Sequence, residues 1–216
     1  MENWIDTHIT LPRYVMLSDE KKNAFSHFLG LILSVYGLLA VLASGSEAPK
    51  AGMAIFALSN IVMYAASGFY HYLESGVMKK MLRVLDHSAI YILIAGSYTP
   101  LLLHVGTPLS KAFTAIIWLS AIIGIVTTLR FWGRFYPLHV ALYAIMGWSI
   151  VLVWDDVIPS IPSDLFRYML AGGIAYTSGL IFYGIRKIPH NHLIWHFFVL
   201  AGSSCFFIGY YLYLLP

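Results

Sequence analysis

Residues 193–215 read LIWHFFVLAGSSCFFIGYYLYLL, an apolar run that contains no Asp, Glu, Lys or Arg. An α-helix rises about 1.5 Å per residue, so about 20 residues cross the roughly 30 Å of hydrocarbon in a bilayer. Backbone amides in lipid must be paired within the segment, and a helix achieves this. The run is therefore predicted to be a transmembrane helix.

Six further stretches of the same kind precede this run, each about 18–23 residues long and separated by short connections. They comprise residues 25–43, 51–73, 87–104, 112–129, 136–154 and 168–185. The seven stretches predict an all-α membrane protein, a seven-transmembrane helix bundle. We expect an N-terminal segment, 1–24, followed by one domain, 25–216. The stretch 25–43 is longer than the apolar region of a cleavable signal peptide, so we expect it to remain in the protein.

The composition agrees with this class. Of the 216 residues, 59% are hydrophobic and 11% are charged, whereas soluble domains carry about 25% charged residues. This excludes an ordinary soluble domain and a disordered chain. The single cysteine, Cys205, excludes an intrachain disulfide and a cysteine-based zinc finger. No segment forms a basic stripe, so no nucleic-acid partner is expected.

The distribution of Lys and Arg predicts the orientation in the membrane. The N-terminal side of the predicted bundle carries ten of them: Arg13, Lys21, Lys22, Lys79, Lys80, Arg83, Arg130, Arg134, Arg186 and Lys187. The opposite side carries the other three: Lys50, Lys111 and Arg167. Because cytoplasmic loops are enriched in Lys and Arg, the N-terminus is predicted to be cytoplasmic and the C-terminus outside.

Several ionisable residues lie at the cytoplasmic ends of the predicted spans. Such residues are costly in a membrane and are candidates for function. His192 and His196 are four residues apart, so they share one face of the last helix. Ser67 and His71 share a face of the helix 51–73 in the same way. Asp86 precedes the next span at the same depth.

This pattern suggests a metal site. Two imidazoles at helical i, i+4 spacing can bind one ion, and His71 supplies a third nitrogen if the two helices pack together. Three protein ligands with one open position are typical of catalytic zinc, whose bound water is activated for attack. Asp86 would then exchange a proton with that water, and Ser67 would hydrogen-bond the water, a substrate carbonyl or a ligand.

An interfacial role for the histidines is the alternative. Histidines at span ends commonly lie at headgroup level and bind nothing, and the helical H-E-x-x-H pattern lacks its Glu here. The residues alone leave both interpretations open. For His27 and His139 the interfacial role is favoured, and hydrogen bonding to the metal ligands is their functional alternative.

Three motifs add a family resemblance. They are residues 67–71, SGFYH; residues 86–100, DHSAIYILIAGSYTP; and residues 192–196, HLIWH. Together they resemble the signature of the hemolysin III family. This family is the bacterial branch of the progestin and adiponectin receptor group, and it is distantly related to the alkaline ceramidases. Residues 23–27, NAFSH, are similar to the family's first-helix motif, with Ser26 where Thr is common.

The resemblance implies a seven-helix bundle with a cytoplasmic N-terminus. It also implies one zinc ion bound by His71, His192 and His196, with a bound water near Asp86 and with Ser67 close by. The animal receptors carry a long N-terminal region that this sequence lacks. Hormone reception is therefore not expected, and a bacterial cytoplasmic membrane is the expected location.

Three functions follow as hypotheses. The first is a zinc-dependent intramembrane hydrolase acting on a lipid amide or ester, with an amide favoured by the ceramidase kinship. The second is a membrane-perturbing hemolysin, although no span shows the polar stripe of a pore lining. The third is a non-enzymatic sensor or regulator of membrane lipid state, in which zinc holds two helices together. A membrane lipid is the expected substrate or ligand in the first and third.

Overall fold

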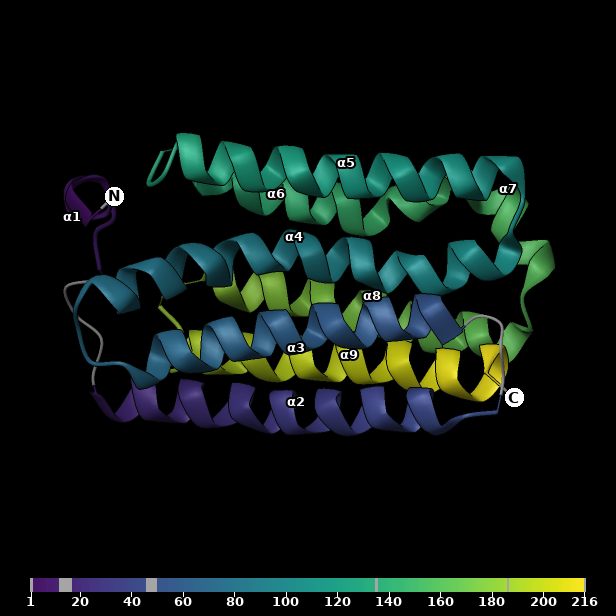
Figure 1. The fold of residues 1–216 in the computed structure, drawn as a ribbon, viewed down its shortest axis with the longest axis horizontal. Helices are drawn as coiled ribbons and strands as arrows, with labels where there is room; N and C mark the ends of the chain where they lie inside the picture. The colour runs from purple at the N-terminus through teal and green to yellow at the C-terminus, as the bar shows by residue number, and fades with distance from the viewer. Residues whose placement is uncertain (1, 12–16, 46–49, 135, 186, 216) are drawn as a thin grey trace.

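The computed structural model describes residues 2–11, 17–45, 50–134, 136–185 and 187–215. Within these ranges every regular element is a helix, and the long helices lie side by side in one bundle (Figure 1). Arg13 and Arg186, which the orientation count includes, lie outside the described residues.

The described part of the chain contains seven helices that are long and apolar enough to cross a membrane, as the sequence predicts. Six are continuous: α2 (Leu17–Ala43), α3 (Lys50–Tyr72), α4 (Val77–Val105), α5 (Pro108–Arg130), α8 (Ser163–Gly184) and α9 (Asn191–Leu214). The remaining one, Leu138–Ser160, is composite. It consists of α6 (Tyr136–Trp148), η1 (Ser149–Val153), α7 (Trp154–Val157) and η2 (Ile158–Ser160), and a short helix, α1 (Glu2–His8), precedes the bundle.

Two helices begin well before their apolar stretches. Helix α2 starts eight residues before position 25, and α4 starts ten residues before position 87. The extension of α2 is amphipathic, because Glu20, Asn23 and His27 recur at helical spacing on one face and are buried. A boundary drawn from hydropathy excludes the charged residues that precede the apolar stretch, whereas the helical spacing of the buried residues extends past them. Polar side chains consequently enter the bundle at this end.

The fifth span is interrupted where the sequence predicts one continuous stretch, 136–154. The 3₁₀ segment η1 breaks it, and a tyrosine from α4 satisfies the backbone at the break. The Tyr98 hydroxyl lies 2.9 Å from the carbonyl oxygen of Met146 and 2.8 Å from that of Gly147, and it accepts from the Ile150 amide at 3.0 Å. Because lipid offers no hydrogen bonds, this side chain makes the interruption tolerable at membrane depth.

Helices α3 and α4 form the centre of the bundle. Helix α3 packs along α2 on one side and α4 on the other, while α5 lies against α4 and α8 against α9 (Figure 1). The described ends of the chain lie at opposite ends of the bundle. Four helix ends meet at the N-terminal end of the bundle: the starts of α2, α4 and α9 and the end of α3.

The contact between α3 and α4 depends on a glycine. A Cβ added at Gly96 would lie 2.1 Å from Ser59 Oγ and 2.6 Å from Ser59 Cβ. A rotamer change of Ser59 moves its hydroxyl but not its Cβ, so the two backbones would have to separate. Small residues at such crossings let membrane helices approach closely.

We expect Gly96→Ala to destabilise the bundle by about 1–3 kcal/mol, the usual cost of overpacking a well-packed contact. The measurement is the thermal denaturation midpoint of the detergent-purified protein. Gly184→Ala is the matched control, because no atom lies within 4 Å of the added Cβ there. Equal midpoints for the two variants would contradict the close packing of α3 on α4.

Candidate metal centre

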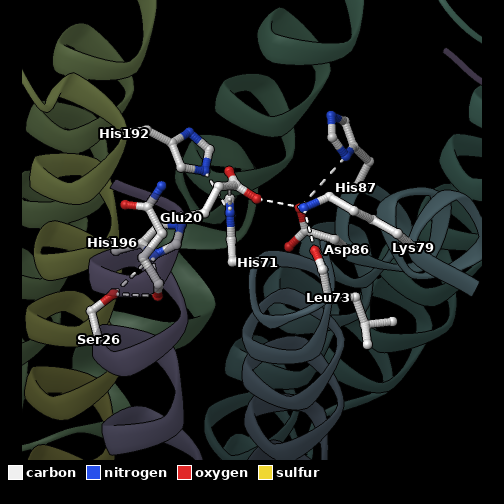
Figure 2. Close-up of polar contacts among 10 residues, drawn as sticks. Glu20, Ser26, His71, Leu73, Lys79, Asp86, His87, His192 and His196 are labelled. Carbon is white, nitrogen blue, oxygen red and sulfur yellow. Dashed lines mark hydrogen bonds and ion pairs between the residues drawn. The ribbon is translucent and has the colours of Figure 1, made fainter. Parts of the chain in front are cut away.

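Three histidines meet inside one end of the bundle (Figure 2). His71 lies in the last turn of α3, and His192 and His196 lie in the first turns of α9. Because α3 and α9 run in opposite directions, the end of one helix meets the start of the other. One nitrogen from each ring lies within 4.8 Å of the other two.

The cluster has a separation that suits a shared ion. The Nε2 atoms of His71 and His192 are 3.1 Å apart. A tetrahedral ion with metal–nitrogen bonds of about 2.0–2.1 Å separates its ligand nitrogens by about 3.3–3.4 Å. His71 and His196 are buried and His192 is partly buried. The donor set therefore fits one divalent ion of the kind that binds imidazole.

Hydrogen bonds to the other ring nitrogens orient two of the rings. Nδ1 of His71 lies 3.1 Å from Oε1 of Glu20, so it carries the proton, and the unprotonated Nε2 faces Nε2 of His192. Ser26 Oγ donates to the Asn23 carbonyl at 2.8 Å and lies 2.9 Å from His196 Nδ1. Since its proton is used, this oxygen accepts from Nδ1 and Nε2 of His196 is free. Such partners fix the tautomer of a metal ligand.

A cavity of about 190 Å³ opens beside the cluster. Its polar side chains include Ser67, Asp86, His192 and His196. The structure thus brings both proposed catalytic residues to the same cavity as two of the three proposed ligands. Away from this end the lining is largely apolar and aromatic, and includes Ile90, Leu93, Leu101, Trp154, Phe166 and Met169.

The two remaining histidines named from the sequence lie in different places. His27 stacks on His196 with a ring-centroid distance of 3.5 Å and an angle of 12°. It contacts the cluster through its ring face, and neither ring nitrogen has a hydrogen-bond partner among the described residues. His139 lies on α6, where Nδ1 is 3.1 Å from the Tyr91 hydroxyl. The structure brings His27 to the cluster and leaves His139 outside it.

Two charged residues at the site were not predicted from the sequence. Glu20 and Lys79 are 9% and 6% exposed, and Lys79 Nζ lies 2.6 Å from Glu20 Oε2 (Figure 2). The apolar pattern assigns Glu20 to the N-terminal segment and Lys79 to a cytoplasmic loop. The spacing of Glu20, Asn23 and His27 would have shown a buried helix face. Nothing in the sequence distinguishes Lys79 from its neighbour Lys80.

These features define a seven-helix bundle with a candidate metal centre at one end. Residues 15–207 match the family of haemolysin-III related proteins, and the chain belongs to this family. It is a multi-pass integral membrane protein, and the resemblance predicted from the motifs is confirmed.

The relatives share much of the chain. Hemolysin-3 of Bacillus cereus is 38% identical over 205 residues, which cover 93% of this chain and 94% of the relative. The hemolysin-3 homolog of Bacillus subtilis (strain 168) is 38% identical over 197 residues, covering 88% and 92%. Monocyte to macrophage differentiation factor of Homo sapiens is 32% identical over 133 residues, covering 60% and 54%. No solved structure matches.

We expect the detergent-purified protein to carry about one divalent ion per chain, as three histidines at one site imply. Elemental mass spectrometry measures this directly. The ion should be lost in His71→Ala and in the double variant His192→Ala, His196→Ala, because each removes ligands from one side of the cluster. His104→Ala, at the exposed opposite end of α4, should retain it. Retention of the ion in His71→Ala would show that α3 supplies no ligand.

Proposed function

We propose that this protein is a zinc-dependent intramembrane hydrolase that cleaves an amide or ester bond of a membrane lipid. The observation that carries the proposal is one shared cavity, in which His192, His196, Asp86 and Ser67 lie at the polar end of an apolar lining. Three imidazoles with an open position are typical of catalytic zinc. An ionisable cluster buried among membrane helices is itself a mark of function.

His71, His192 and His196 are the residues that would hold the ion. When bound, zinc supplies a Lewis acid that polarises a carbonyl and activates a water molecule. The Asp86 carboxylate takes a proton from the attacking water and returns it to the leaving amine or alcohol. The products are a fatty acid and the amine or alcohol part of the lipid. The Ser67 hydroxyl donates to the carbonyl oxygen, where negative charge develops.

The cavity lining favours a lipid substrate. Aliphatic and aromatic side chains from α4, α7, α8 and α9 line it away from the polar end, including Leu93, Trp154 and Met169. Such surfaces bind apolar chains, and a few polar groups fix the position of the reacting bond. An amide is favoured over an ester by analogy with the alkaline ceramidases.

We expect Asp86→Asn to lower hydrolysis by about 100-fold or more, the usual contribution of a general acid–base residue, while zinc content stays unchanged. The measurement is release of fatty acid from a labelled N-acyl lipid in detergent micelles. Asp164→Asn is the control, because this carboxylate pairs with Arg167 on the exposed surface, at the start of α8. Undiminished turnover in Asp86→Asn would exclude the mechanism.

Membrane perturbation is a second candidate, favoured by the name hemolysin-3 that two relatives carry. The same preparations distinguish it from hydrolysis. Leakage of dye from lipid vesicles that persists in His71→Ala would support this candidate, because perturbation by the bundle needs no metal. Intact vesicles in the presence of the native protein would exclude it.

We also propose that the N-terminus and the histidine cluster face the cytoplasm. The support is the excess of Lys and Arg at the ends of spans on that side, ten against three. The cluster lies at the bundle end where α2 begins, so it shares the side of the N-terminal segment.

Cysteine labelling of intact cells tests this orientation in a Cys205→Ala background. A membrane-impermeant maleimide should label Ser160→Cys, at the exposed outer end of the fifth span, without lysis. It should label Ser75→Cys, in the exposed connection between α3 and α4, only after lysis. The reverse pattern would establish the opposite orientation.

A further inference from the structure

A buried ion pair lies on the Nδ1 side of the His71 ring. Glu20 comes from the start of α2 and Lys79 from the first turn of α4, and both side chains are almost fully enclosed. We propose that Glu20 and Lys79 are positioning residues that hold the His71 imidazole in the tautomer and direction required for metal binding. The inference rests on the metal centre proposed above and adds two residues that do not touch the ion.

The carboxylate of Glu20 has a separate partner for each oxygen. Oε1 lies 3.1 Å from His71 Nδ1, and Oε2 lies 2.6 Å from Lys79 Nζ (Figure 2). Rotation of the carboxylate would break one of these contacts. The Nδ1 proton of His71 is therefore held on one side of the ring, and Nε2 points toward His192.

Lys79 also fixes the backbone next to the ligand. Its Nζ donates to the Leu73 carbonyl at 2.6 Å, just past the end of α3 and two residues after His71. One ammonium group thus joins α4 to the end of α3, while Glu20 joins both to α2. The imidazole is positioned by its own hydrogen bond and by the helix that carries it.

Stability alone does not account for these charges. Burying an ion pair costs desolvation that the attraction often only just offsets, and apolar pairs frequently serve a fold as well. The pair between Asp6 and Lys80 provides the comparison, because its nitrogen–oxygen distance is also 2.6 Å. Its Asp6 side chain is 50% exposed, whereas that of Glu20 is 12% exposed. Only the buried pair contacts a candidate metal ligand.

The test is the zinc affinity of the full chain in detergent, measured by competition with a chelator of known affinity. Glu20→Gln should bind zinc about 10–100-fold more weakly, because the amide is uncharged and offers one accepting oxygen to two donors, His71 Nδ1 and Lys79 Nζ. Lys79→Met should also weaken binding, and Lys79→Arg should lie closer to the native chain because it keeps a donor for both acceptors. Asp6→Asn should match the native chain.

The double variant Glu20→Gln, Lys79→Met separates positioning from general destabilisation. It removes both buried charges, so it leaves neither unpaired. Because Lys79 acts in part by holding the Glu20 carboxylate, the loss of zinc affinity in the double variant should be smaller than the sum of the losses in the two single variants. The visible spectrum of the Co²⁺-loaded chain supplies a second readout. It should change in Glu20→Gln, which alters the ligand field, and should not change in Asp6→Asn.

Each outcome decides the question. Zinc affinity of Glu20→Gln within about twofold of the native chain, with an unchanged Co²⁺ spectrum, would overturn the positioning role and leave the metal centre standing. Additive losses in the double variant would show that Lys79 acts independently of Glu20 and would overturn the pairing. Failure of the native chain to bind zinc at all would overturn the metal centre itself.

Discussion

Hydrocarbon solvates neither a backbone amide nor a charge, and the architecture follows from how the chain meets that constraint. The spans are helices because a helix pairs its own backbone groups. Where the fifth span departs from this geometry, the Tyr98 hydroxyl supplies the missing partners. Where charges enter the bundle, as at Glu20 and Lys79, they enter as a hydrogen-bonded pair. Both of these departures from an apolar helix are thus matched by specific contacts.

The same constraint gathers polar chemistry at one end of the bundle. Helices that alternate in direction bring the end of α3 together with the starts of α2, α4 and α9. Residues far apart in the chain, such as His71 and His196, become neighbours there. The apolar cavity begins at this end, so a lipid in it can place a polar bond beside the histidines while its chains remain among apolar side chains. In the proposed mechanism, position along the bundle therefore separates the reacting bond from the acyl chains.

The sequence predicts the seven spans because their composition alone sets them apart from the connections. The spacing of His192 and His196 also predicts that these two share a face of one helix, because this is a local helical property. The addition of His71 depends on the packing of two helices and is implied by the family resemblance. The sequence does not predict Glu20 or Lys79, since hydropathy places every charge outside a span and only tertiary packing shows that these two are buried. The sequence also does not predict the 3₁₀ interruption at η1, because a contact with Tyr98 on another helix stabilises it. Local sequence patterns identify the helices, whereas the contacts between residues on different helices are seen only in the folded structure.

Helix α2 faces two environments, lipid along its middle and the polar end of the bundle at its first turns. Its middle faces outward, with Ile32 and Tyr36 largely exposed on the surface that lipid covers. Its first turns are amphipathic and carry the groups that orient ligands on two other helices. Glu20 bonds to His71 on α3, and Ser26 bonds to His196 on α9. Because both bonds involve Nδ1, both leave Nε2 for an ion. Helix α2 supplies none of the three candidate ligands, but it determines which ring nitrogen two of them present.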